Sequence, residues 1–127
     1  MISIGSDLID IRRIEKTLNR FGNKFKKRIF TQKEIEKCER RKESASCYAK
    51  RFAAKEAAAK ALGTGFREGV FWKDLEVDNL PSGEPTICFS GMSKQHLERL
   101  LVNSQNHSVK LTITDEYPYA QALVIIN

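Results

Sequence analysis

Residues 48–62, YAKRFAAKEAAAKAL, have the strongest intrinsic helix preference in the chain. Alanine has the highest helix propensity of all residues, and this segment is rich in it. The glycine-containing residues 63–65, GTG, follow directly and predict where the helix ends. Ser44 or Ser46 is the expected N-cap, because a serine hydroxyl can accept a hydrogen bond from the first free amides of a helix. The sequence therefore predicts one long helix in the middle of the chain.

A short strand and further helices are expected before this central segment. Residues 2–8 alternate loosely between apolar and polar side chains, which predicts a strand. From Asp10 to Phe21 the apolar residues recur at helical spacing, and the basic residues lie elsewhere on the helix. Residues 31–34, TQKE, form a capping box, which predicts the start of another short helix.

The residues after the central helix favour strands. Residues 75–77 and 86–89 flank a turn-rich loop at residues 81–85 and predict a hairpin. Two further alternating segments, residues 109–113 and 122–126, predict an antiparallel pair, with one helix inserted before them. This order of elements predicts an α+β fold, a small antiparallel sheet with packed helices, in a single domain of residues 1–127.

The composition limits the class of protein. The chain has 127 residues, a net charge of +6 and a pI near 9.3, which suits nucleic acid, an acidic protein, a polyphosphate cofactor or an anionic membrane. Arg51 and Lys55 form a basic stripe on the central helix, of the kind that a solvated face carries. No apolar run approaches the ~20 residues that cross a bilayer. Residues 1–10 carry two acids and no base, unlike a secretory or mitochondrial signal.

The cysteines indicate a reducing compartment. Cys38, Cys47 and Cys88 are odd in number and widely spaced. This spacing fits neither a disulfide framework nor a zinc site. We therefore expect three buried or half-buried thiols and a cytoplasmic protein.

Asp7, Glu56 and Lys60 are the residues whose chemistry is most suggestive. Two carboxylates and a lysine suit Mg²⁺ with a phosphate, because Mg²⁺ takes one or two carboxylates and completes its shell with water and phosphate oxygens. Two structural alternatives remain open. Glu56 and Lys60 have the spacing of a helical ion pair worth about 0.2–0.5 kcal/mol. Asp7, alone or together with Asp10, is placed to cap the following helix.

Two sequence motifs resemble those of a known family, the holo-[acyl-carrier-protein] synthases. Residues 4–14, IGSDLIDIRRI, resemble the amino-terminal motif of that family. Residues 51–61, RFAAKEAAAKA, resemble its second motif, which is long and highly specific. The Gly-x-Pro of residues 83–85 and the Tyr-Ala of residues 119–120 also fit, so that the resemblance covers essentially the whole chain.

The resemblance implies a 4′-phosphopantetheinyl transferase that takes part in fatty acid biosynthesis. Members move 4′-phosphopantetheine from coenzyme A to a serine of apo-acyl carrier protein and release adenosine 3′,5′-bisphosphate. The implied cofactor is Mg²⁺. The implied partners are coenzyme A, an acidic acyl carrier protein and two further copies of the chain, in a homotrimer that binds coenzyme A between subunits.

The resemblance also assigns roles to individual residues. Asp7 and Glu56 match the metal ligands, and Lys60 matches a lysine close to the pyrophosphate. Glu56 and Lys60 are the expected catalytic residues, with Glu56, or a metal-bound water that it orients, as the base for the serine hydroxyl. The expected contacts of coenzyme A are Arg51, Lys60, Gly63, Gly83, Pro85 and Lys110. The expected docking residues for the carrier protein are Arg13 and Arg20.

Lys110 departs from the family pattern. Many members have a histidine at this place, nine residues before the tyrosine of the last motif, which is Tyr119 here. Lys110 can attract a phosphate as a cation, but we do not expect it to inherit a histidine's role in proton transfer.

A small basic RNA-binding module is the alternative from another class of function. The net charge of +6 permits it. No strand shows the interleaved aromatic and basic pattern of an RNA-recognition sheet, however, and no G-x-x-G clamp is present. We therefore expect neither nucleic acid nor a membrane as a partner.

Overall fold

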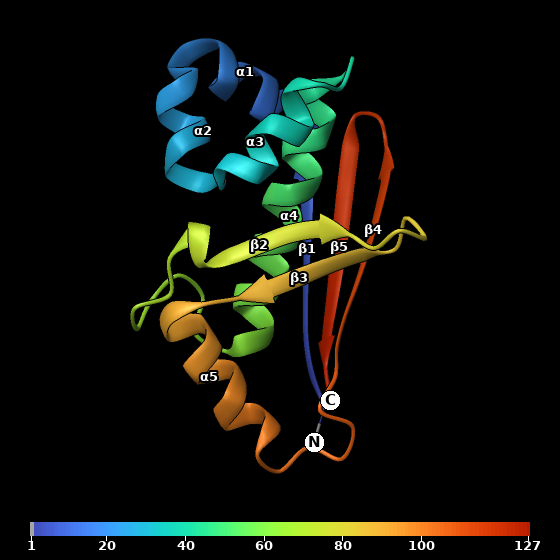
Figure 1. Cartoon of the computed structure of the whole chain (residues 1–127). Coiled ribbons are helices and arrows are strands. Elements are labelled where there is room, and N and C mark those ends of the chain that lie inside the picture. Colours follow the sequence, from blue (N-terminus) through green and yellow to red (C-terminus); the bar gives the residue numbers. More distant parts are fainter. Residues whose placement is uncertain (1) are drawn as a thin grey trace.

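The computed structural model describes residues 2–127 and shows antiparallel strands packed against helices (Figure 1). The larger sheet has the strand order β1-β5-β4, and the smaller one pairs β2 with β3. The strands are β1 (Ser3–Asp10), β2 (Leu75–Asn79), β3 (Pro85–Phe89), β4 (Val109–Glu116) and β5 (Tyr119–Ile126). The helices are α1 (Ile11–Phe21), α2 (Asn23–Ile29), α3 (Gln32–Glu39), α4 (Ser44–Leu62), the short 3₁₀ turn η1 (Trp72–Asp74) and α5 (Gly91–Leu101). The predicted α+β fold is confirmed.

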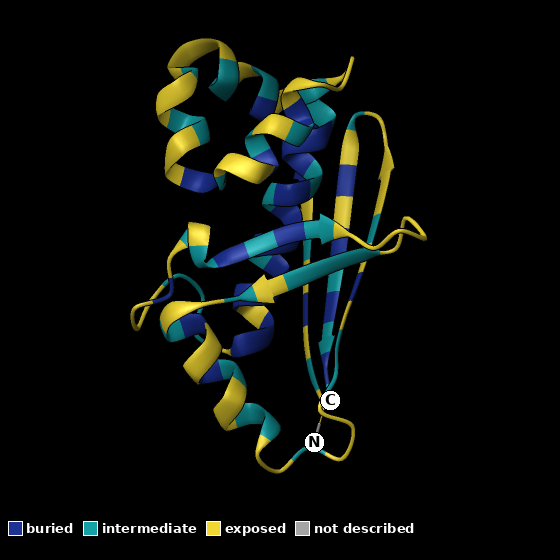
Figure 2. Cartoon of the chain, in the orientation of Figure 1, coloured by how far each residue is buried: buried dark blue, intermediate teal, exposed yellow. Residues whose placement is uncertain are grey.

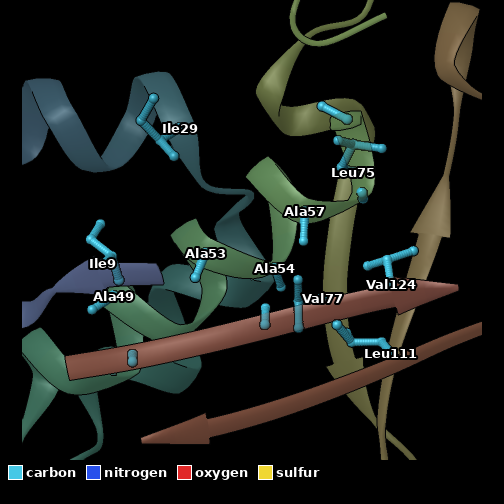
Figure 3. Packing of buried hydrophobic residues seen from close by; sticks show 14 of the residues in the cluster. Ile9, Ile29, Ala49, Ala53, Ala54, Ala57, Leu75, Val77, Leu111 and Val124 are labelled. Atoms are coloured by element: carbon cyan, nitrogen blue, oxygen red, sulfur yellow. The ribbon is translucent and has the colours of Figure 1, made fainter. Parts of the chain in front are cut away.

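Helix α4 runs through the middle of the molecule. The larger sheet covers one side of it, and the β2–β3 hairpin crosses another side (Figure 1). Most of its residues are buried, as the dark colour of α4 in Figure 2 shows. A helix that is buried on nearly every side needs small side chains if its neighbours are to come close, and its alanines supply them. Figure 3 shows Ala53, Ala54 and Ala57 lying in one cluster with Val77 and Val124.

Strand β1 approaches α4 more closely than a side chain would permit. A Cβ atom built on Gly5 would lie 2.0 Å from the carbonyl oxygen of Ala57 and 2.5 Å from the amide nitrogen of Ala61. Real Cβ atoms do not come so near to backbone atoms, so only glycine fits here. This crossing fixes the position of the residues that follow Gly5 on β1.

Helix α4 begins earlier than the sequence predicts. Its first residue is Ser44 and its N-cap is Glu43, which makes no side-chain capping hydrogen bond. The expectation that Ser44 or Ser46 caps the helix is therefore wrong. At the other end Gly63 adopts a left-handed conformation with φ of 83° and ends the helix as predicted.

The basic stripe on α4 is not a solvated face, and this prediction is wrong as well. Arg51 is 6% exposed and Lys55 is fully buried. Lys55 Nζ lies 2.6 Å from Glu34 Oε1 and donates hydrogen bonds to the carbonyl oxygens of Ile29 and Trp72. Helix α3 and η1 cover this side of α4, and the helical period alone does not reveal such a cover.

The cysteine prediction also needs correction. Cys38 and Cys47 form a disulfide with their Cα atoms 5.4 Å apart, and Cys88 is exposed. The expectation of three buried or half-buried thiols is therefore wrong. The pair forms because the short connection after α3 brings the ends of α3 and α4 together, which an odd count of widely spaced cysteines does not indicate.

The helices formed by residues 2–127 include none that is long and apolar enough to cross a membrane.

Candidate functional site

The structure brings Asp7 and Lys60 into direct contact. Lys60 Nζ lies 3.1 Å from Asp7 Oδ1 and donates a hydrogen bond to the carbonyl oxygen of Ser6. The contact follows from the local fold, because Gly5 lets β1 cross α4 beside Lys60 and Asp7 comes two residues later. The side chain of Asp7 is 17% exposed, whereas that of Lys60 is 51% exposed. The lysine can therefore reach an incoming anion.

Glu56 belongs to the same cluster. It lies one turn before Lys60 on α4 and is half-buried. Burial raises the pKa of Glu56, the negative charge of Asp7 raises it further, and the positive charge of Lys60 partly opposes both. Two carboxylates and one ammonium group thus act on one another at this place, which we call the acidic cluster.

The acidic cluster fits a magnesium ion. Among residues 2–127 no group of three or more His, Cys, Asp or Glu side chains is arranged to hold a metal. Mg²⁺ does not need such a group, because one or two carboxylates suffice when water and a substrate phosphate complete its shell. The repulsion between Asp7 and Glu56 that raises the Glu56 pKa is the repulsion that a divalent cation would relieve. Asp7 and Glu56 are therefore the residues that would hold the ion.

A second group of polar residues lines a hollow between α4, the hairpin and β4, which we call the basic hollow. Arg51 lines it together with Gly83 and Pro85. Arg51 is buried, burial lowers its pKa, and its Nε is a buried donor without a hydrogen-bond partner. Sequence reasoning missed three further cations of this hollow, which are Arg41, Lys42 and Lys50. The run RRK at residues 40–42 is a visible signal for the first two.

Two more residues are expected to contact coenzyme A. Gly63 lies near the acidic cluster, and Lys110 lies near the basic hollow. Gly63 ends α4 three residues after Lys60, beside the acidic cluster, and nothing lies within 4 Å of the place where its Cβ would be. Lys110 is on β4 and its side chain is 73% exposed. Its Nζ lies 4.0 Å from Glu84 Oε1, next to the loop that carries Gly83 and Pro85. Lys110 does not line the basic hollow itself, but its exposed side chain can exchange the contact with Glu84 for a phosphate beside this loop.

The acidic cluster and the basic hollow lie on different sides of α4. Arg51 and Glu56 are five residues apart, which places their side chains about 140° apart around a helix with 3.6 residues per turn. The acidic cluster faces β1, at one edge of the larger sheet, whereas the basic hollow is bordered by Ile113 and Asp115 of β4, at the other edge. One copy of the chain does not unite the two groups of residues.

The expected docking residues lie on helix α1. Arg13 and Arg20 are both exposed. Arg12, by contrast, is bound to Asp10, with 2.7 Å between its Nη2 and the carboxylate oxygen. Among these three arginines, Arg13 and Arg20 therefore keep charges that can meet an acidic partner.

Comparison with known proteins identifies the family. The model of the 4′-phosphopantetheinyl transferase superfamily matches residues 3–122. The chain belongs to this superfamily. It is 58% identical over 126 residues to the holo-[acyl-carrier-protein] synthase of Brucella ovis, covering 99% of this chain and 94% of that one. The resemblance to the holo-[acyl-carrier-protein] synthases is thereby confirmed.

Solved structures of the same family share the fold. The holo-[acyl-carrier-protein] synthase of Neisseria meningitidis superposes with a TM-score of 0.83 at 33% identity, covering 100% of this chain and 99% of that one. The Helicobacter pylori enzyme, solved in complex with coenzyme A, superposes with a TM-score of 0.82 at 31% identity, covering 98% and 99%.

Proposed function

We propose that this protein is a Mg²⁺-dependent holo-[acyl-carrier-protein] synthase. It transfers 4′-phosphopantetheine from coenzyme A to a serine of apo-acyl carrier protein and releases adenosine 3′,5′-bisphosphate, in support of fatty acid biosynthesis. The observation that carries the proposal is the convergence of Asp7, Glu56 and Lys60 at one place. The family, and the coenzyme A complex of the Helicobacter pylori relative, support it.

The acidic cluster would bind the pyrophosphate of coenzyme A and activate the serine hydroxyl of the carrier protein. Mg²⁺, held by Asp7 and Glu56, would supply positive charge that neutralises the pyrophosphate and the departing bisphosphate. Lys60 exchanges its contact with Asp7 for a phosphate oxygen and adds a second positive charge there. Glu56, or a water that it orients, accepts the proton of the serine hydroxyl. The serine oxygen then bonds to the phosphorus of phosphopantetheine as the bond to the bisphosphate breaks.

In the proposed enzyme, which is a homotrimer, each active site is shared between two copies of the chain. Coenzyme A carries its pyrophosphate and its 3′-phosphate on one molecule, yet the acidic cluster and the basic hollow occupy opposite edges of the larger sheet. If the acidic cluster of one copy faces the basic hollow of the next, both ends of coenzyme A are bound. In that arrangement Arg51 and Lys110 contact the 3′-phosphate side, beside the backbone of Gly83 and Pro85, and Gly63 stays next to the pyrophosphate.

The outer face of the larger sheet supports self-association. Ile4 and Leu8 of β1 project there and are 60% and 65% exposed. Their register partners on β5 are Ile125 and Gln121, and Leu123 lies between these two. An apolar sheet face of this kind is typical of a surface that another protein covers.

The carrier protein and the cellular location complete the proposal. Arg13 and Arg20 give α1 a positive surface that steers an acidic carrier protein to the site. The transfer takes place in the cytoplasm, in a single transferase domain of residues 1–127.

A mass measurement tests the proposal. Apo-acyl carrier protein is incubated with this protein, coenzyme A and Mg²⁺, and its intact mass is followed. Transfer adds ~340 Da to the serine, and the gain is expected to require Mg²⁺, Asp7 and Glu56. No gain in mass, together with salt-sensitive binding of RNA, would replace the proposal by the RNA-binding alternative.

A further inference from the structure

The disulfide between Cys38 and Cys47 lies directly beside the basic hollow. It joins the carboxyl end of α3 to the first turn of α4, two elements that lie next to each other in Figure 1. Between these helices runs a short cationic connection, residues 40–43, and Arg41 and Lys42 from it line the hollow. The disulfide therefore closes the base of the loop that carries two of the cations in the hollow.

One sulfur of the pair also touches a third cation. Arg51 Nη1 donates a hydrogen bond to Cys47 Sγ over 3.1 Å. Cys47 is 6% exposed and itself lines the hollow, whereas Cys38 is fully buried behind it. A small molecule that enters the hollow can reach Cys47, and Cys38 is placed to attack only after Cys47 has reacted.

We propose that thiol–disulfide exchange at Cys38 and Cys47 controls how tightly the basic hollow binds the phosphates of coenzyme A. The inference rests on the proposed function, because it takes the hollow as the site of the 3′-phosphate. The oxidant is a low-molecular-weight disulfide. A disulfide in a reducing compartment is usually transient or redox-sensing rather than a permanent staple.

The exchange balances in two steps. The Cys47 thiolate attacks one sulfur of the small disulfide, which forms a mixed disulfide and releases one small thiolate. The Cys38 thiolate then attacks the sulfur of Cys47, which closes the protein disulfide and releases the second small thiolate. Each released thiolate takes up a proton that a cysteine thiol has lost. The two cysteines are oxidised, and the small disulfide is reduced to two thiols.

Two physical effects make the oxidised form the tighter binder. In the reduced form the guanidinium of Arg51 favours the Cys47 thiolate, which then competes with the ligand's phosphate for that positive charge. In the oxidised form the sulfur that accepts the hydrogen bond from Arg51 is neutral, so it competes with the ligand's phosphate for the guanidinium much less than a thiolate does. The disulfide also restrains residues 40–43, so that less conformational freedom is lost when Arg41 and Lys42 bind a phosphate.

Binding of adenosine 3′,5′-bisphosphate to the two redox forms tests the inference. This nucleotide carries the phosphates but no thiol, so it does not itself reduce the disulfide as coenzyme A would. The full chain is oxidised with glutathione disulfide or reduced with a phosphine, and intact mass confirms a difference of about 2 Da. We expect calorimetry to give a Kd about three- to tenfold lower for the oxidised form. Both forms have the same sequence, so a folding defect of a variant does not confuse the comparison.

Cysteine variants show which residues carry the redox dependence of nucleotide binding. Cys88→Ser removes the exposed third cysteine and is expected to keep the full redox response, whereas Cys38→Ser/Cys47→Ser is expected to lose it. Equal Kd values for the two forms, or failure of glutathione disulfide to close the pair, overturn the inference and leave the transfer activity untouched. Absence of nucleotide binding in both forms overturns the proposed use of the hollow as well.

Discussion

The negative charges of Asp7 and Glu56 repel each other in the free protein. A divalent cation bound between them would relieve this repulsion, which favours binding of the cation. Lys60 offsets part of the repulsion by contacting Asp7 over 3.1 Å. The sequence indicated these three residues by type and, through the resemblance, by role. It could not show that they meet, because the contact between β1 and α4 joins residues more than fifty positions apart.

Asp7→Asn is expected to remove most of the Mg²⁺-supported transfer. The amide keeps the shape of the side chain but not its charge, so we expect kcat/KM to fall by about 10²–10³-fold. The rate of mass gain on apo-acyl carrier protein measures it. Asp78→Asn, the same change at an aspartate of β2 that pairs with Lys33, serves as the control and should keep the wild-type rate. A normal rate in Asp7→Asn at saturating Mg²⁺ would remove Asp7 from the site.

Gly5→Ala is expected to destabilise the protein more than a methyl group usually does. The added Cβ would meet backbone atoms of Ala57 and Ala61 at 2.0 and 2.5 Å, and backbone cannot rotate away as a side chain can. We expect the free energy of unfolding to fall by about 3 kcal/mol. Urea unfolding measures it, with Ser6→Ala at the neighbouring exposed position as a control that should change stability by less than about 0.5 kcal/mol. Equal stabilities of the two variants would show that β1 can move off α4 at little cost.

At the scale of elements, a buried ion pair joins the helices to the hairpin. Glu34 Oε1 accepts hydrogen bonds from Lys55 and from the amide of Thr31, and Glu34 Oε2 accepts one from the amide of Val77. Lys55 also binds the carbonyl of Ile29. Helices α2, α3 and α4 and strand β2 are thereby held in one arrangement, with Glu56 next to Lys55 on α4.

Lys55→Met is expected to destabilise this arrangement strongly. It leaves the buried Glu34 carboxylate without its cation, which costs about 3–5 kcal/mol in comparable pairs. Urea unfolding is again the measurement, and the double variant Glu34→Gln/Lys55→Met should recover part of the loss because no unpaired charge remains. Lys37→Met, which removes a partly exposed partner of Asp78, should cost less than about 1 kcal/mol. A loss in Lys55→Met no larger than in Lys37→Met would contradict the assigned role of the pair.

Helix α1 is expected to act in recognition of the carrier protein and not in binding of coenzyme A. Arg13→Glu reverses an exposed charge on it, so we expect the KM for acyl carrier protein to rise by at least about tenfold while the KM for coenzyme A holds. Steady-state kinetics with each substrate varied in turn measure both values. Lys94→Glu makes the same reversal on α5 and should change neither. If both KM values stay at the wild-type level in Arg13→Glu, docking takes place elsewhere.

The elements themselves were predictable to different degrees. Alternation predicted β4 and β5, and the capping box at Thr31 predicted the start of α3, because these signals are local. Helix α2 has no predicted counterpart, although Phe25 and Ile29 stand at helical spacing within its basic run. The burial of Arg51 and Lys55 was missed because a helical wheel shows which residues share a face but not what covers that face.

At the scale of the whole molecule, the proposed site requires more than one copy of the chain. The carboxylates lie at the β1 edge of the larger sheet and the buried arginine lies on the β4 side. A closed trimer gives every copy one neighbour on each side, so each acidic cluster can meet a basic hollow of the next subunit. A variant that damages one edge therefore leaves the other edge of the same chain intact.

Mixed trimers of two inactive variants test this arrangement. Asp7→Asn disables the acidic cluster and Arg51→Met disables the basic hollow, so each variant alone is expected to be nearly inactive. When equal amounts are unfolded, mixed and refolded together, random assembly places an intact cluster against an intact hollow at about one site in four. We expect about a quarter of the activity of refolded wild type, measured as mass gain on apo-acyl carrier protein, and none when the variants are refolded separately and then combined. If native mass spectrometry shows mixed trimers but activity stays at the level of the single variants, coenzyme A is bound within one copy, since no chain in the mixture carries both intact groups.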